Sequence, residues 1–306
     1  MSSVLLRGPA YVLGEHEIEH GQIANLPARA EEFRMVPDPG LWGWGSVFRT
    51  ERGLAAMAAE SGTATLRAAG LEPGSIDALI LCSTEVPGPA DGHGRVMEAV
   101  LTGIGLRDIP FFGLNFNRCL NFLSALDVAR SFVASGRFGR VLVITTDQVR
   151  DEADRMANYA LFSDGAASCV VTAGDEGGDG FHLVACASAQ DTGSLDGANQ
   201  IDADLARQVN EDLLGPLGMK LGDVAGLMHN NIFLPLLVMK ERQAGFTAEQ
   251  LWTANISRVG HCFAADPLIN LVDRTALGHV RPGQYHLLAS SVPGARTGVL
   301  LRELVQ

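Results

Sequence analysis

The sequence has few basic residues, few aromatic residues and no long apolar run. Its 306 residues include 23 Lys and Arg against 35 Asp and Glu, and the net charge of −12 argues against general affinity for nucleic acid or anionic membranes. An anionic substrate would therefore have to be bound by local basic residues. No stretch of about 18 apolar residues occurs, and the first residues lack a charged segment followed by a sufficient apolar run. We therefore expect a soluble protein of the cytoplasm.

The cysteines are few, and their pattern does not suggest disulfide pairing. There are five of them, an odd number, and no C-x-x-C pair occurs. Such usage is more typical of reduced thiols in a cytoplasm than of a disulfide framework. The cysteines are Cys82, Cys119, Cys169, Cys186 and Cys262.

One metal-binding pattern is present, but its surroundings do not support it. The segment HEIEH (16–20) satisfies H-E-x-x-H, which binds zinc only when one helix presents both imidazoles and a third ligand exists. Gly14 and Gly21 bracket the segment, and the apolar flanks of a long active-site helix are absent. We expect a polar loop here and no metal. A glycine-rich nucleotide loop of the G-x-x-x-x-G-K-[ST] type does not occur either.

Aliphatic residues and glycines are abundant, which favours an α/β fold. Hydrophobic residues make up 47% of the chain, aromatic residues only 6%, and glycines number 35. Residues 65–84 and 127–147 each read as a helix, a turn with glycine, and a buried strand. Residues 168–173 and 182–189 are further strand candidates.

Two halves of the sequence resemble each other. GLEPGSIDALIL (70–81) aligns without a gap with GMKLGDVAGLMH (218–229), and a second, weaker echo pairs residues 116–147 with 261–290. We therefore predict duplicated βαβ-rich halves, residues 1–170 and 171–306, joined by a hinge-like connection at 170–180. No low-complexity linker separates them, so we expect them to pack as one body.

Cys119 stands at a predicted strand-to-helix junction. An apolar strand-like stretch (109–116) precedes it, and apolar residues at helical spacing follow it. The positive end of a helix dipole favours a thiolate, so Cys119 is a candidate nucleophile. Position alone leaves the alternative open, because buried cysteines are also common core residues.

The segment 116–147 resembles the active-site segment of the thiolase-fold condensing enzymes, specifically the ketoacyl-acyl-carrier-protein synthase III group. Further matches follow in the same order at residues 159–173, 226–235, 257–268 and 281–301. The resemblance covers roughly residues 45–306. It implies a thiolase-like α/β fold, in which two duplicated halves form a layered αβαβα body, and an active site where the halves meet.

The resemblance also implies roles for three side chains. Cys119 would take an acyl group from a thioester, and His229 would activate the acceptor or hold its carbonyl. His261 stands where the synthase III group has asparagine, as in the elongating ketosynthases. It would donate an N–H to an enolate oxygen or act as general base toward a hydroxyl or amine. Cys262, beside it, echoes Cys119 in the repeat and is expected to be a packing residue.

The oxyanion site departs from the family pattern. The family uses a backbone N–H from a C-terminal glycine-rich turn, which corresponds to Ser291–Gly294 here. Pro293 falls on or beside the donor position and has no N–H. Either Gly294 takes over by a one-residue shift, or only the Cys119 N–H remains. Loss of one oxyanion donor typically costs about 100- to 1000-fold in rate, so the chemistry is expected to be altered.

The resemblance further implies the substrates and the assembly. Trp44 and Arg49 lie where the family seats coenzyme A, with Trp42 and Arg52 as alternatives. Acyl-coenzyme A and an acyl carrier protein are equally plausible donors, and no permanently bound cofactor is expected. The family forms homodimers, with the strand near Cys119 contributing to the interface. Loops at 84–110 and 190–215 would set the acyl length.

We therefore predict a ketosynthase III-like acyltransferase of a specialised biosynthetic pathway. The acceptor is either a malonyl-type carbanion, by decarboxylative Claisen condensation, or a hydroxyl or amine. A catalytically inactive partner subunit of a heteromeric ketosynthase is the alternative, although it would have no reason to keep the thiol and both imidazoles. A plain hydrolase using Cys119 is a further possibility.

Overall fold

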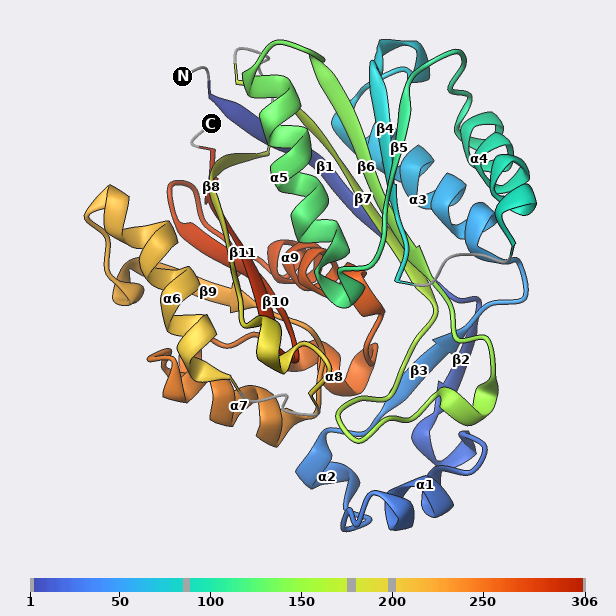
Figure 1. The fold of residues 1–306 in the computed structure, drawn as a ribbon, viewed down its shortest axis with the longest axis vertical. Helices are drawn as coiled ribbons and strands as arrows, with labels where there is room; N and C mark the ends of the chain where they lie inside the picture. The colour runs from blue at the N-terminus through green and yellow to red at the C-terminus, as the bar shows by residue number, and fades with distance from the viewer. Residues whose placement is uncertain (1–2, 85–88, 175–179, 198–201, 305–306) are drawn as a thin grey trace.

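The computed structural model describes residues 3–84, 89–174, 180–197 and 202–304 (Figure 1). The strands in these ranges form a nine-stranded sheet with the order β5-β4-β6-β7-β1-β8-β11-β10-β9 and a two-stranded sheet of β2 and β3. The strands are β1 (Val4–Leu13), β2 (His16–Glu19), β3 (Ser46–Arg49), β4 (Ala78–Cys82), β5 (Phe111–Leu114), β6 (Arg140–Asp147), β7 (Gly165–Ala173), β8 (Phe181–Gln190), β9 (Val224–Met228), β10 (Tyr285–Val292) and β11 (Ala295–Glu303). The helices are α1 (Leu26–Glu32), α2 (Pro39–Trp42), α3 (Leu54–Ala69), α4 (Ala90–Ile104), α5 (Asn121–Ala134), α6 (Ala203–Leu214), α7 (Leu234–Gln243), α8 (Ala254–Arg258) and α9 (Asp266–Ala276).

The large sheet repeats one strand arrangement, as the internal sequence similarity predicts. The run β4-β6-β7-β1 corresponds to β9-β10-β11-β8, and in both runs the first pair is parallel and the next two pairs are antiparallel. The runs join where β1 pairs with β8. The predicted boundary between residues 170 and 171 falls within β7, and the division into two units stays a prediction. Of the predicted hinge, residues 175–179 lie outside the described residues.

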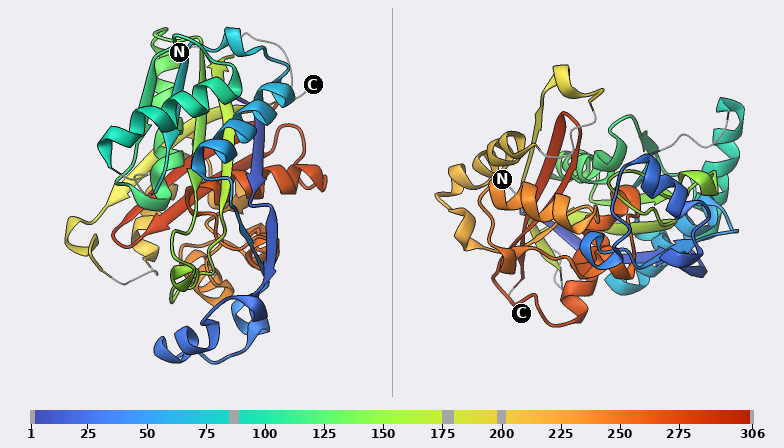
Figure 2. Two further views of the ribbon diagram at one scale, coloured as in Figure 1. Left: turned by 90° about the vertical axis from the view of Figure 1, so that its right-hand side faces the viewer. Right: turned by 90° about the horizontal axis from the view of Figure 1, so that it is seen from below.

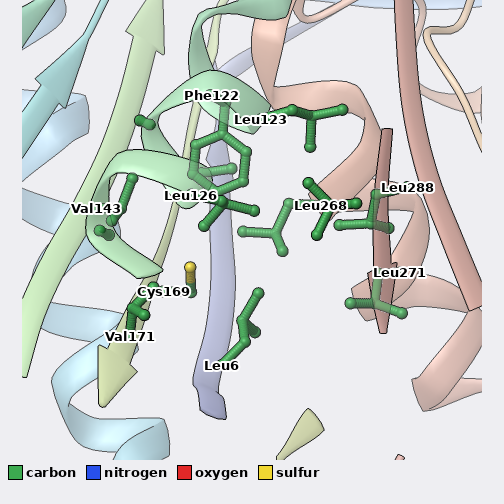
Figure 3. Close-up of a cluster of buried hydrophobic side chains, with 14 of the residues drawn as sticks. Leu6, Phe122, Leu123, Leu126, Val143, Cys169, Val171, Leu268, Leu271 and Leu288 are labelled. Carbon is green, nitrogen blue, oxygen red and sulfur yellow. The ribbon is translucent and has the colours of Figure 1, made fainter. Parts of the chain in front are cut away.

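Two helices lie between the halves, and four others cover the outer faces (Figure 1). Helix α5 contacts β6, β7 and β11, and α9 contacts β1, β9 and β10, so each touches strands of both halves. Helices α3 and α4 lie on the outer side of one half, and α6 and α7 on the outer side of the other. Leu126 of α5, Leu268 of α9 and Leu6 of β1 meet in the largest apolar core (Figure 3). The predicted layered αβαβα body is confirmed.

The segment around Cys119 folds as its pattern predicts. Strand β5 leads into the one-turn helix Arg118–Leu120, and α5 and β6 follow. The apolar side chains of α5 recur at helical spacing and are buried against the sheet. Gly136 adopts a φ of 72° just beyond the helix, a left-handed conformation that glycine adopts at no steric cost.

The polar N-terminal segment forms a small lobe at one end of the molecule, where β2, β3, α1 and α2 gather (Figures 1 and 2). The HEIEH segment is not the loop we expected, because His16–Glu19 pairs with Ser46–Arg49 as an antiparallel strand. His20 begins a separate one-turn helix, so no helix presents both imidazoles. Within the described ranges, no group of three or more His, Cys, Asp or Glu side chains is arranged to hold a metal.

The expectation that two stretches of the chain are loops needs correction. The stretches 84–110 and 190–215 are not plain loops, since they contain α4 and α6. The five cysteines form no disulfide in this structure. Among the described residues, no helix has the length and apolar character needed to cross a membrane.

One buried polar side chain in β10 lacks a partner. His286 is 0% exposed, and neither ring nitrogen forms a hydrogen bond. Burial first, and then the positive charge of Arg274, lower the pKa of His286 to about 4. The folded protein therefore keeps this imidazole neutral well below the pH at which the unfolded chain protonates it.

Replacing His286 with leucine is expected to make the free energy of unfolding less sensitive to acid. As the pH falls from about 6.5 toward 4, the unfolded chain binds a proton that the folded protein excludes, which costs up to about 3 kcal/mol. Urea unfolding at several pH values between 7 and 4 measures this slope. A residual slope should remain, because the pKa of His229 is also lowered. Identical slopes for wild type and His286→Leu would contradict the interpretation.

Candidate active site

Cys119 lies at the wall of a pocket where the two halves meet. The sulfur belongs to the turn of helix just before α5, so the positive end of that helix dipole is close to it. The pocket has a volume of about 260 Å³. The described residues that line it are Thr84, Arg118, Cys119, Tyr159, Phe162, Ile232, His261, Phe263, Ser291, Val292 and Pro293.

His261 faces the cysteine from the C-terminal half. Its Nε2 lies 3.4 Å from the Cys119 Sγ. The backbone of His261 is held by the segment just before β7, because its N–H donates to the Leu161 carbonyl at 2.8 Å and its own carbonyl accepts from the Ser163 N–H at 2.9 Å. The ring stands 5.1 Å from that of Phe162. The structure therefore brings together two of the three predicted catalytic side chains.

A carboxylate that the sequence analysis did not single out completes this arrangement. Asp266, the first residue of α9, is fully buried, and its Oδ2 accepts a hydrogen bond from His261 Nδ1. Oδ2 also accepts from the Asn231 N–H at 2.6 Å, and Oδ1 accepts from the Cys262 N–H at 2.7 Å. Cys119, His261 and Asp266 thus form a line of nucleophile, imidazole and carboxylate.

The charges around His261 favour its protonated form. Burial alone would lower its pKa, but the negative charge of Asp266, and that of Cys119 when ionised, outweigh burial and raise the pKa of His261 to about 10. The imidazole is therefore an imidazolium at neutral pH. An imidazolium beside a sulfur stabilises the ionised nucleophile over the neutral thiol.

His229 directly follows β9, and it forms no hydrogen bond with Cys119. Its Nε2 accepts a hydrogen bond from Lys240 Nζ at 3.1 Å and lies 3.2 Å from the Ser291 Oγ, and it does not line the pocket. Burial lowers the pKa of His229 well below its usual value, and the charges of Lys240 and Arg296 lower it further. This imidazole is therefore neutral.

The turn between β10 and β11 places proline at the pocket. Pro293 lines the wall, whereas Gly294 adopts a φ of 68° and packs against the backbone of residues 191–195. The carbonyl of Gly294 accepts from the Asp191 N–H at 2.8 Å. Gly294 as an oxyanion donor stays a prediction, and the geometry gives it no direct support.

The predicted coenzyme A residues lie away from this pocket. Trp44 is buried, its ring centroid is 6.1 Å from that of Phe233, and it lines a separate hollow of about 420 Å³ beside α2 and α8. Arg49 lies on β3 and pairs with Glu51 at 2.9 Å. The alternatives differ: Trp42 is half-buried, and Arg52 pairs with Glu15.

Cys262 is fully buried, and burial first, then the charge of Asp266, raises its pKa well above the usual value. The sequence echo suggested that Cys262 corresponds to Cys119, but the structure aligns a different residue with Cys119. The one-turn helices before α5 and α9 correspond, and they begin at Arg118 and Phe263, with φ values of 52° and 51°. Ala264 therefore occupies the position equivalent to Cys119.

Comparison with known proteins agrees with this architecture. A family described as 3-oxoacyl-[acyl-carrier-protein] synthase III matches residues 115–189. A β-ketoacyl-[acyl-carrier-protein] synthase III of Nitratidesulfovibrio vulgaris is 27% identical over 274 residues, which cover 80% of this chain and 81% of the relative.

Solved structures share the fold over nearly the whole chain. ChlB3, described as an acyltransferase, superposes with a TM-score of 0.85 at 16% identity and covers 99% of this chain and 98% of its own. The 3-oxoacyl-[acyl-carrier-protein] synthase III of Aquifex aeolicus superposes with a TM-score of 0.81 at 20% identity, over 98% of this chain and 99% of its own.

In fold, site and sequence the chain resembles the thiolase-fold condensing enzymes. The chain is a 3-oxoacyl-[acyl-carrier-protein] synthase III-like enzyme of the acyltransferase class. The names of the matched family and of the Nitratidesulfovibrio vulgaris relative both refer to acyl carrier protein.

Replacing His261 with glutamine is expected to slow alkylation of Cys119 by iodoacetamide about 10- to 100-fold at pH 7, because the neutral amide no longer stabilises an ionised sulfur. Peptide mass spectrometry measures the rate at Cys119 itself, and Cys119→Ala gives the background from the other thiols. Equal rates at Cys119 in wild type and His261→Gln would show that the imidazole does not activate the sulfur.

Proposed function

We propose that this enzyme transfers an acyl group from a coenzyme A or carrier-protein thioester, by way of Cys119, to a hydroxyl or amine in a specialised biosynthetic pathway. The observation that carries the proposal is the buried line of Cys119, His261 and Asp266. This arrangement generates a nucleophile and handles protons in acyl transfer.

In the first half of the reaction, the Cys119 sulfur attacks the thioester carbonyl carbon. A new S–C bond forms, the bond from carbon to the donor sulfur breaks, and the leaving thiolate takes a proton from His261. The backbone N–H of Cys119 is the proposed donor to the oxyanion, while Pro293 has no N–H to contribute. Asp266 keeps the ring oriented and stabilises the imidazolium.

In the second half, the now neutral Nε2 of His261 removes the proton from an acceptor hydroxyl or amine. The acceptor oxygen or nitrogen bonds to the acyl carbon, the S–C bond breaks, and the product leaves as an ester or amide. Proton transfer by a positioned imidazole typically contributes about 100- to 10,000-fold in rate.

The surroundings of His229 favour this reaction over carbon–carbon condensation. Decarboxylation of a malonyl extender develops negative charge on its thioester oxygen, which needs hydrogen-bond donors. The Nε2 of His229 instead accepts from Lys240, so this nitrogen presents no N–H to a substrate. The name of the fold neighbour ChlB3, an acyltransferase, agrees with this preference.

We also propose that two copies associate through β5. This strand lies at the edge of the large sheet, so one side of it has free backbone donors and acceptors. Phe116, just beyond its end, is 90% exposed. A second copy would cover both.

The roles proposed for Trp44 and Arg49 in holding coenzyme A would require contacts outside the Cys119 pocket.

The decisive experiment is intact-protein mass spectrometry after incubation with a panel of acyl-coenzyme A and acyl-carrier thioesters. An acyl mass shift in wild type that is absent in Cys119→Ala is expected. Alcohols, amines, malonyl thioesters or water are then added to the labelled protein. Discharge by an alcohol or amine supports the proposal, discharge only by malonyl thioesters indicates condensation, and discharge only by water indicates a hydrolase. No labelling by any donor would favour an inactive partner subunit.

Replacing each histidine separately distinguishes the two chemistries. His261→Gln should slow discharge of the acyl-enzyme at least about 100-fold, whereas His229→Gln should stay within about five-fold of wild type because His229 lies outside the proton path. Glutamine at position 229 can still accept from Lys240, and thermal unfolding checks that both variants are folded. A larger loss in His229→Gln than in His261→Gln would overturn the assignment of His261 as the base.

A further inference from the structure

Arg118, the residue immediately before the nucleophile, brings a positive charge to the pocket. It is half-buried and lines the wall together with Cys119, Tyr159 and His261. Its backbone φ of 52° lies in the left-handed region, which costs energy for a residue with a side chain. Such conformations persist where the surrounding structure holds them, and they concentrate at functional sites.

The charge of Arg118 is not neutralised within the described part of the chain. Its Nη2 donates to the Pro293 carbonyl at 2.9 Å, and it forms no ion pair there. Two fully buried arginines differ, since Arg155 pairs with Asp164 at 3.2 Å and Arg296 with Glu241 at 2.7 Å. None of the described residues that line the pocket is Asp or Glu.

The hydrogen bond to Pro293 leaves most of the guanidinium free. Arginine carries five N–H donors, and only one acceptor is present. A half-buried guanidinium with unused donors matches a carboxylate, which it binds through two parallel hydrogen bonds. The positive charge of Arg118 also acts on Tyr159, which lines the same pocket. Burial raises the pKa of the Tyr159 phenol, and the charge of Arg118 acts to lower it.

We propose that Arg118 binds the distal carboxylate of a dicarboxylic acyl donor, so that the acyl group loaded onto Cys119 is of the succinyl or glutaryl class. This inference rests on the proposed function, since it names the substrate of the same site. The donor is favoured over the acceptor because Arg118 adjoins Cys119 in the chain and therefore lies beside the acyl group as the thioester forms.

With such a donor, the bonds and protons of the acylation step balance. The Cys119 sulfur bonds to the succinyl carbonyl carbon, the carbon–sulfur bond of coenzyme A breaks, and coenzyme A leaves as a thiol with the proton of His261. The distal carboxylate stays ionised throughout and accepts hydrogen bonds from Arg118. No oxidant or further reactant is required.

The test compares pairs of donors that differ only in the distal group. Succinyl- is paired with butyryl-coenzyme A, and glutaryl- with valeryl-coenzyme A, so that a methyl group replaces each carboxylate. Single-turnover acylation of Cys119 is followed by intact-protein mass spectrometry, and the quantity compared is the ratio of the two second-order rate constants in each pair. Arg118→Gln removes the charge but keeps an amide donor for the Pro293 carbonyl.

Wild type is expected to prefer the dicarboxylic donor, and Arg118→Gln is expected to lower the ratio about 10- to 100-fold, the range that hydrogen bonds to a charged group supply. Arg118→Lys should retain part of the preference. Arg107→Gln, an equal change of charge at an exposed position before β5, should leave the ratio as in wild type.

Three results separate the proposals. If Arg118→Gln slows both donors equally, Arg118 only holds the Pro293 turn and the inference is wrong. If wild type prefers butyryl- and valeryl-coenzyme A, the inference is wrong and acyl transfer stands. If no donor of either kind, and none of the wider thioester panel, labels Cys119, the proposed function fails instead.

Discussion

The carboxylate of Asp266 is the constraint on which the site depends. A buried charge is costly unless it is paired and hydrogen-bonded, and this one accepts from the His261 ring and from the backbone N–H groups of Cys262 and Asn231. These contacts fix the loop that carries His261 and the loop that follows β9 against the start of α9. The imidazole position, its protonation and the distance to Cys119 all follow from them. An unpartnered carboxylate here would destabilise the fold and misplace the base together.

The duplication of the fold explains why Cys119 and His261 meet. Cys119 precedes α5 and His261 precedes α9, and these two helices occupy equivalent places in the repeat and lie together between the halves (Figures 1 and 3). Even the capping contacts repeat: the Asn117 N–H donates to the Asn121 side chain at 3.2 Å, as the Cys262 N–H does to Asp266. One half uses this junction for a thiol, and the other uses it for a carboxylate and an imidazole.

The sequence predicted what depends on local pattern and on order along the chain. The α/β class, the repeat, the strand-to-helix junction at Cys119 and the candidacy of His261 were all available from it. Asp266 was not recognised, because an acidic residue at a helix start usually serves only as a cap. The surroundings of His229 could not be predicted from the sequence either. A lysine on a helix such as α7 is expected to face solvent, but in the folded protein Lys240 is buried against the His229 imidazole. HEIEH formed a strand because pairing with β3, a long-range contact, outweighed its polar composition.

The two imidazoles show how one fold assigns different proton chemistry to the same side chain. His229 is held neutral by burial and neighbouring cations, whereas His261 is held protonated by Asp266 and by the Cys119 sulfur. The second of those influences changes during the reaction. In the proposed reaction the acylated sulfur of Cys119 can carry no negative charge, so only Asp266 is left to raise the pKa of His261. The imidazolium therefore gives up its proton most readily as the donor thiol leaves. In the proposed reaction the neutral ring that remains then accepts the proton of the acceptor, so His261 would act first as an acid and then as a base.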